Sequence, residues 1–192
     1  NCDIMEFITF KEIFYFAILT LAIGYIFTGI FVKRPRTVWD RMHPKKVKLE
    51  DFKFAAIVAA PAIILHELAH KFVAMGFGFN ATFELFSFGL ILGVFLKAIG
   101  SPFLIIAPGY VTISQAAFSN AMAYRLIAFA GPLTNLILWG ISKTLLKKLK
   151  KMNMTQRAAL LMSQKVNILL FFFNMIPFGP FDGAKVFFGP PS

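Results

Sequence analysis

The sequence predicts a polytopic all-α membrane bundle with a short re-entrant β-rich segment. The chain has 192 residues, of which 58% are hydrophobic and only 15% charged, whereas soluble domains contain about 25% charged residues. Its mean hydropathy is +0.71. Several apolar runs approach the length of about 20 residues that a membrane-spanning helix needs. These observations together favour a membrane protein over a soluble domain.

Four helices are expected, within one transmembrane domain that covers residues 1–192. They are placed at 13–32, 54–79, 121–141 and 166–181. The last run is the shortest, and polar residues come just before it. The chain stops soon afterwards at Ser192, which suggests that further helices or a soluble domain follow.

The stretch at 80–119 is apolar but rich in phenylalanine, glycine and proline. Its side chains alternate over 82–88, and Pro108-Gly109, a turn dipeptide, separates two further apolar runs. We expect short strands or a re-entrant sheet here, with a pair of short helices as the alternative. Irregular backbone at membrane depth persists only where protein or water covers it, so this segment should pack against a cavity.

The net charge of +11 is concentrated in two clusters, at 33–53 and 143–157, each between apolar runs. The positive-inside rule explains this placement and predicts that both loops are cytoplasmic, in a multi-pass protein of the cell membrane. The expected contact is therefore with membrane lipids, which are anionic on that side, and not with nucleic acid. With both loops on one side, the segment between the second and third helices crosses the membrane zero or two times, as a re-entrant sheet would. The single cysteine excludes an internal disulfide framework.

The most informative motif is His66-Glu67-Leu68-Ala69-His70, which follows an apolar run within the second predicted helix. Two histidines four residues apart on a helix lie on the same face, where one metal ion can take both. The glutamate between them is placed to hold a water beside the metal and take its proton. The motif therefore predicts water chemistry at a metal inside a membrane.

A third protein ligand is needed if one metal position is to stay open. The remaining histidine, His43, lies in the first basic loop. Among the acidic residues, only Glu67, Glu84 and Asp182 have apolar surroundings. Asp182 is the predicted ligand, because its depth along the fourth apolar run is compatible with that of His66, and Glu84 is the reserve. Lys71 is expected to reach the interface or to pair with an acid.

These motifs carry a family resemblance. The His-Glu-x-x-His pattern, followed by the segment from Asn174 to Gly183, resembles the site-2 protease family of intramembrane zinc metalloproteases, whose later element is Asn-x-x-Pro…Asp-Gly. The segment Gly131-Pro132-Leu133-Thr134-Asn135 is similar to the family's Gly-Pro-x-x-Asn. The resemblance covers about residues 54–188. It departs from the family at Phe181, where leucine is usual, and in the long apolar insert between the motifs.

The resemblance implies one zinc ion per chain, held by His66, His70 and Asp182, with Glu67 as the catalytic residue that activates water and later protonates the leaving amine. It implies that Asn174 supports the oxyanion or the substrate chain, and that Asn135 is a packing residue or positions the substrate chain. The implied activity is that of a zinc endopeptidase that cuts transmembrane segments of protein substrates, in regulated intramembrane proteolysis.

A substrate helix must unwind before water can attack its backbone. An edge strand from 80–119 would hold the unwound segment extended. The alternative function is a metal-binding membrane scaffold or transporter without protease activity, although no internal repeat of the transporter kind is evident. Nothing in the sequence indicates an oligomeric state.

Overall fold

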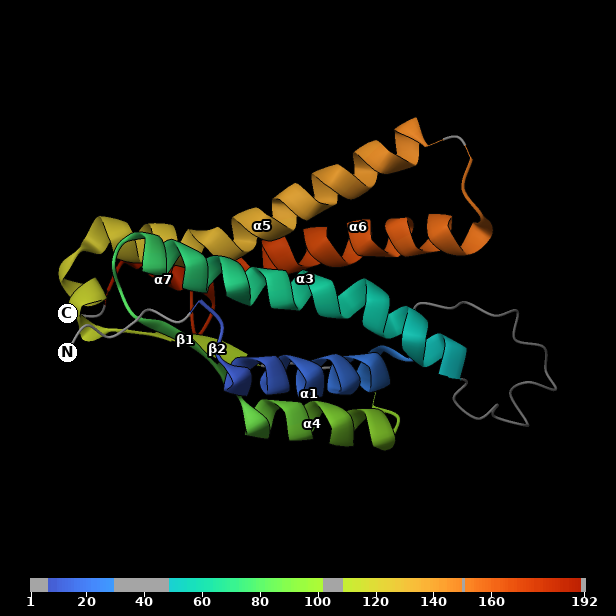
Figure 1. Cartoon of the computed structure of the whole chain (residues 1–192), viewed down its shortest axis with the longest axis horizontal. Helices are drawn as coiled ribbons and strands as arrows, with labels where there is room; N and C mark the ends of the chain where they lie inside the picture. Colours follow the sequence, from blue (N-terminus) through green and yellow to red (C-terminus); the bar gives the residue numbers. More distant parts are fainter. Residues whose placement is uncertain (1–6, 30–48, 102–108, 150, 191–192) are drawn as a thin grey trace.

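The computed structural model describes residues 7–29, 49–101, 109–149 and 151–190. Its elements, in chain order, are α1 (Phe10–Phe27), α3 (Leu49–Gly76), β1 (Ala81–Leu85), α4 (Ser87–Ala98), β2 (Gly109–Ile113), the 3-10 helix η1 (Gln115–Ser119), α5 (Ala121–Lys148), α6 (Met154–Asn174) and α7 (Asp182–Phe188). The fold is an all-α membrane fold with one small sheet, as the sequence predicted (Figure 1).

Within the described part of the chain, three helices are long and apolar enough to cross a membrane, namely α1, α3 and α5. Helix α6 has 21 residues but is not among them. Polar residues such as Arg157, Gln164 and Lys165 lower the hydropathy of its N-terminal part. The predicted fourth span is therefore a helix, but a more polar one than the other three.

Helix α3 is the central element of the bundle. It lies between α1 on one side and α5 and α6 on the other, while α4 covers the far side of α1 (Figure 1). Helices α1 and α3 pack closely because Gly24 of α1 carries no side chain. A Cβ there would lie 2.9 Å from the ring of Phe52 on α3. Leu19, Ile23 and Ala59 are fully buried between α1 and α3.

Local capping explains why the helix bounds differ from the predicted ones. Helix α1 begins early because Thr9 and Glu12 form a capping box, and it ends before Gly29, whose φ is +77°. Helix α5 continues past residue 141 through Lys147 and Lys148, cations that favour a helix C-terminus. Apolar runs therefore locate the helices but not their ends.

The fourth predicted helix, 166–181, is wrong at both ends. A capping box between Asn153 and Gln156 starts α6 much earlier, and the helix stops at Asn174, three residues before Pro177. Asp182 is not on α6, because it is the first residue of the separate helix α7.

The segment at 80–119 is less β-rich than predicted. Strands β1 and β2 pair antiparallel, from Ala81↔Ile113 to Leu85↔Gly109, but the 12-residue helix α4 and the helix η1 occupy much of the rest. The predicted alternation is correct as far as residue 85 and fails beyond it. The first of the two apolar runs beside Pro108-Gly109, residues 103–107, lies outside the described residues.

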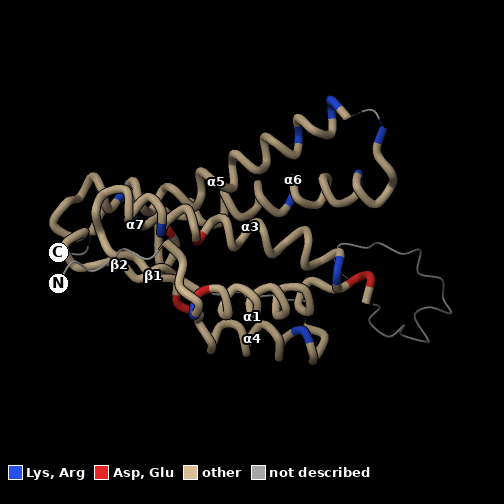
Figure 2. Tube along the Cα trace, viewed as in Figure 1, with Lys and Arg blue, Asp and Glu red and all other residues tan. Residues whose placement is uncertain are grey.

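Basic residues gather at the end of the bundle where α5 and α6 are joined, opposite the sheet (Figure 2), whereas the first turn of α3 at the same end carries Glu50 and Asp51. The second basic cluster is not one loop, since residues 143–148 finish α5 and residues 154–157 begin α6. Most of the first cluster lies outside the described residues. The cytoplasmic orientation of this end stays a prediction.

Candidate metal centre

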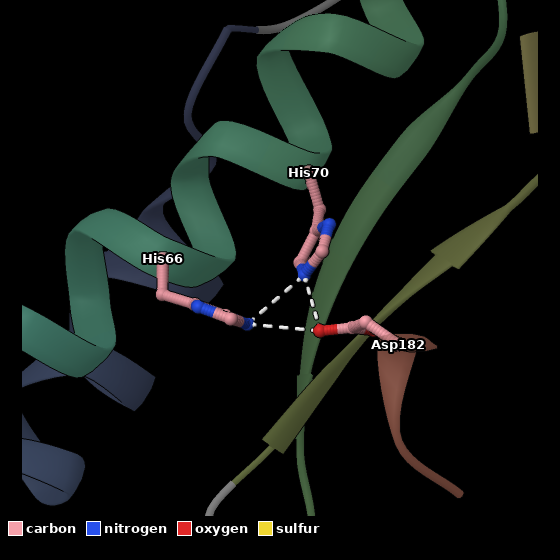
Figure 3. A group of neighbouring side chains, drawn as sticks. All are labelled: His66, His70 and Asp182. Carbon is pink, nitrogen blue, oxygen red and sulfur yellow. Dashed lines mark hydrogen bonds and ion pairs between the residues drawn. The ribbon is translucent and has the colours of Figure 1, made fainter. Parts of the chain in front are cut away.

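Three predicted ligands from two distant parts of the chain meet in the structure. Asp182 Oδ2 lies 3.1 Å from His66 Nε2 and 3.2 Å from His70 Nε2, and the two nitrogens are 3.1 Å apart (Figure 3). All three residues are buried. They form a group of ligand atoms close enough together to hold one metal ion.

Helix geometry places the two histidines. They stand on successive turns of α3, and both face α5 and α7. Asp182 reaches them from the turn that follows α6. Gly183 is required next, because a Cβ there would lie 2.5 Å from the backbone carbonyl of Met175. The Asp-Gly pair thus lets the chain fold back tightly enough to present the carboxylate.

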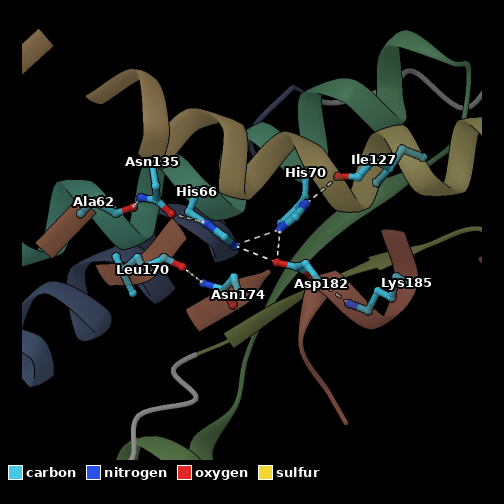
Figure 4. A network of polar contacts seen from close by, with 9 residues as sticks. All are labelled: Ala62, His66, His70, Ile127, Asn135, Leu170, Asn174, Asp182 and Lys185. Atoms are coloured by element: carbon cyan, nitrogen blue, oxygen red, sulfur yellow. Dashed lines mark hydrogen bonds and ion pairs between the residues drawn. The ribbon is translucent and has the colours of Figure 1, made fainter. Parts of the chain in front are cut away.

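The second nitrogen of each imidazole is already bonded to an oxygen acceptor. His66 Nδ1 lies 2.6 Å from Asn135 Oδ1, and His70 Nδ1 lies 2.7 Å from the carbonyl oxygen of Ile127 (Figure 4). In a neutral imidazole, the nitrogen that faces an acceptor carries the proton, so Nε2 carries the lone pair. Two nitrogen lone pairs and a carboxylate oxygen therefore face one another, and a cation satisfies all three at once.

Asn135 is fixed by its own partners. It is fully buried, and its Nδ2 donates to the carbonyl of Ala62 and to Asn167 Oδ1, both at 3.0 Å. Asn167 Nδ2 donates in turn to the backbone carbonyl of Ser163 at 2.9 Å. These bonds set which end of the Asn135 amide faces His66. They occupy the groups with which Asn135 would contact a substrate, so its geometry is that of a residue that orients a ligand.

Gly131 supplies the space that a metal requires. A Cβ at this position of α5 would lie 2.6 Å from His66 Nε2, and it would also clash with His70 Nε2. Zinc binds imidazole nitrogen at about 2.0–2.1 Å. The missing methyl group therefore leaves room beside both ligand nitrogens. Two imidazoles and one carboxylate are a donor set that suits zinc, and the residues present fit the ion.

The free oxygen of Asp182 faces a cation of the same helix. Lys185 Nζ lies 3.3 Å from Asp182 Oδ1, so Oδ2 is left for the histidine side (Figure 4). The Lys185 side chain is 44% exposed. It can therefore move, and it holds the carboxylate less firmly than Asn135 holds His66.

The other predicted residues have separate places. No described residue hydrogen-bonds the Glu67 carboxylate, which leaves it free to bind water. Asn174 Nδ2 donates to the carbonyl of Leu170 at 3.0 Å, and its second N–H is free of protein acceptors among the described residues. Glu84 is not at the metal centre, because it pairs with Lys11 at 2.8 Å. Glu84, the reserve ligand, therefore takes part in an ion pair with Lys11 and is not a ligand of the metal centre.

Sequence reasoning missed three contributors to the centre. Asn167 shares a face with Asn174, but nothing in the sequence showed that it would meet Asn135 from another helix. The family-like segment that begins with Gly131-Pro132 lies inside α5, but nothing in the sequence shows that Gly131 leaves space beside the two histidine nitrogens. Lys185 follows Asp182 by three positions, a helical spacing that signals a contact once α7 is known to be a helix.

Comparisons with known proteins agree with this centre. The chain is 36% identical over 136 residues to a protein of Methanocaldococcus jannaschii named "Putative zinc metalloprotease MJ0611", an alignment that covers 70% of this chain and 69% of that protein. It is 28% identical over 147 residues to "Putative zinc metalloprotease YwhC" of Bacillus subtilis, covering 69% and 67%. No family model and no solved structure matches the chain. The buried His66, His70 and Asp182 centre and the extent of the first alignment together place the chain in the zinc metalloprotease family to which MJ0611 belongs.

Proposed function

We propose that the protein is an intramembrane zinc endopeptidase of the site-2 type, which hydrolyses peptide bonds in the transmembrane segments of other proteins. The observation that carries the proposal is the buried ligand group between helices long and apolar enough to span a membrane. Ionisable groups in such helices are expensive and usually functional. The names of the two relatives support the protease class.

The residues of the centre divide the work of hydrolysis. His66, His70 and Asp182 would hold one zinc ion, which supplies a Lewis acid and makes water nucleophilic near neutral pH. Glu67 takes the proton from the attacking water and passes it to the leaving amine. Asn135 keeps the imidazole of His66 in the tautomer that leaves Nε2 unprotonated. Asn174 offers its free N–H to the developing oxyanion or to the substrate chain.

The sheet offers the substrate one edge. In an antiparallel pair, hydrogen-bonded and non-hydrogen-bonded residue pairs alternate. Ser114 N donates to the Asn80 carbonyl at 3.0 Å, so the pair three positions further along, Phe83↔Val111, has backbone groups that point away from the partner strand. No described residue hydrogen-bonds the outward N–H of Val111. We propose that an extended peptide pairs with this outer edge of β2.

Strand addition at β2 suits a transmembrane substrate, because a helix must unwind before its backbone can be attacked. The proposal places the unwound segment along Val111, on strands that contact α3. Val111→Pro removes the outward N–H but no β1–β2 ladder bond. It should slow cleavage of helical substrates far more than cleavage of extended peptides, whereas Val111→Thr, which keeps the N–H, should behave as the wild type. Equal losses on both substrates would count against strand addition.

The deciding experiment measures zinc and proteolysis together. Detergent-purified wild type, Glu67→Gln, Asp182→Ala and the control Glu84→Gln are assayed for zinc content and for cleavage of a model transmembrane segment. We expect one zinc per chain in wild type, retained in Glu67→Gln and lost in Asp182→Ala. Cleavage should fall at least about 100-fold in Glu67→Gln, the loss expected when a general base is removed. Glu84→Gln should resemble the wild type.

The same experiment separates the protease from a metal-binding scaffold or transporter. Tightly bound zinc without any cleavage that depends on Glu67 would favour those functions. Zinc flux measured in vesicles would then distinguish them, because a transporter should move zinc whether or not Glu67 is present.

A further inference from the structure

A second buried charged cluster lies on α3, directly after the last histidine of the metal motif. Lys71 Nζ is 2.6 Å from both carboxylate oxygens of Glu12, and each side chain is 1% exposed. Neither side chain forms a hydrogen bond or ion pair with the metal ligands in the described part of the chain. Burying two charges costs several kcal/mol per ion unless the pair and its remaining hydrogen bonds are well arranged. This pair therefore calls for an explanation separate from metal binding.

Glu12 joins three elements that are far apart in the sequence. Besides Lys71 on α3, its carboxylate accepts hydrogen bonds from Thr9 N at the start of α1 and from Phe83 N on β1, both at 2.8 Å. The ion pair holds the carboxylate in place, and the carboxylate in turn holds the strand. This one carboxylate thus links the sheet by hydrogen bonds and an ion pair to the metal-bearing helix, in addition to the apolar packing of Ala81 and Phe83.

The bond to Phe83 has a defined place in the sheet. Phe83 is in a pair whose backbone groups point outward, as the bond between Ser114 and Asn80 requires. Glu12 therefore closes the outer edge of β1 at its middle residue. The two edges of the sheet differ, since β1 is fastened to α1 and α3, whereas no described residue bonds the corresponding N–H of Val111 on β2.

We propose that Glu12, held by Lys71, is a positioning residue that fixes the β1–β2 hairpin at its distance from the metal centre and directs substrate to the β2 edge. The inference rests on the proposed function, because it concerns how that protease would hold its substrate. Lys71 acts through Glu12, and Glu12 acts through the Phe83 backbone. Loss of the anchor should impair binding of a substrate that must be held extended, and should leave zinc binding intact.

The test compares two double variants that both remove the buried charges. Glu12→Gln with Lys71→Met keeps an oxygen that can accept from Phe83 N, whereas Glu12→Met with Lys71→Met leaves no acceptor. Replacing both partners of a buried ion pair by apolar residues of similar size often preserves the fold, unlike removal of one partner. Zinc content and thermal unfolding check that both variants are folded and loaded.

Two measurements report whether Glu12 holds β1 in place, namely hydrogen exchange and KM. Hydrogen exchange of the peptide that contains β1 should be faster in the Met-Met variant than in the Gln-Met variant. KM for a helical transmembrane substrate should rise about 5- to 10-fold in the Met-Met variant, in line with the net contribution of one ordinary hydrogen bond. In the Gln-Met variant KM should stay near the wild-type value, and kcat and zinc content should be unchanged in both.

A neighbouring surface pair provides the control. Lys11 and Glu84 also join α1 to β1, but the Lys11 side chain is 54% exposed, so Lys11→Met should change neither exchange nor KM. Equal hydrogen exchange of β1 in the two double variants would refute the claim that the oxygen at position 12 holds β1. Faster exchange with an unchanged KM would overturn its role in substrate positioning and leave the protease assignment intact. If the wild type cleaves nothing, the proposed function fails, and with it the positioning role, while exchange still decides whether the anchor exists.

Discussion

Replacing Gly131 with alanine tests whether the space between the two histidine nitrogens is the place where the metal binds. The new Cβ would lie 2.6 Å from His66 Nε2 and closer still to His70 Nε2. Nonbonded carbon atoms pack at about 3.5–4.0 Å, whereas zinc needs an approach of about 2.0–2.1 Å to both nitrogens. The methyl group and the ion therefore compete for the same volume.

The expected loss follows from the cost of moving α5 or the imidazoles out of the way. Overpacking of a well-packed interior costs about 1–3 kcal/mol, and each 1.4 kcal/mol is about a tenfold change in affinity. Zinc affinity of Gly131→Ala should therefore fall about 10- to 100-fold. A competition titration with a chromophoric zinc chelator measures this directly, with zinc content per chain as the check.

Gly140→Ala is the matched control, because it lies on the same helix and no atom is within 4 Å of its Cβ position. It should bind zinc as the wild type does and gain up to about 1 kcal/mol in helix stability. Wild-type zinc affinity in Gly131→Ala would refute the assignment of this space to the metal. Equal loss in both variants would show that the effect comes from the helix backbone and not from the centre.

Three further outcomes are expected. Asn135→Leu should lower zinc affinity about 10- to 100-fold by freeing His66 Nδ1, as a zinc titration will show. Ser142→Ala should not, because the Ser142 hydroxyl reaches Asn135 only through Ser163 and Asn167. Lys185→Met should weaken zinc binding less than about tenfold in the same titration, since an exposed ion pair contributes little. Chelation should lower the thermal stability of the wild type by about 2.7 kcal/mol if zinc was present at 100 times its Kd, and in scanning calorimetry Asp182→Ala should show no such change.

The ligands could be predicted from sequence because few residues compete for the role. A helix fixes the relation of His66 to His70, and only two further carboxylates, at Glu84 and Asp182, were left in apolar surroundings. The choice between them depended on depth along the chain, and the structure brings Asp182 to the histidines. The helical spacing of the two histidines and the elimination of the other acidic residues were therefore sufficient to predict the three ligands.

The β-rich segment shows where pattern reasoning fails. Alternation over 82–85 identified β1, but the same apolar composition continues into α4. Phe88, Ile91 and Phe95 are exposed in the structure and recur at spacings of three and four, which is a helical period. The helical period was present in the sequence, but the preceding alternation dominated the interpretation.

Contacts between distant segments could not be predicted outside the metal ligands. Lys71 was expected either to reach the interface or to pair with an acid, and its partner, Glu12, is 59 residues away. Asn135 and Asn167 meet across two helices in the same way. Local periodicity gives the face of a helix on which a residue lies, but the neighbour of that face depends on how the whole bundle packs.

One turn of α3 explains why the metal centre and the hairpin belong together. His66 and His70 direct their rings toward α5 and α7, while Lys71, one residue later and about 100° further around the helix, is directed toward α1 and β1. A rotation or bend of α3 at this turn would move the ligands and the sheet anchor together. A single helical turn therefore links the ligand group to the sheet along which the proposed substrate would lie, and this is a short connection.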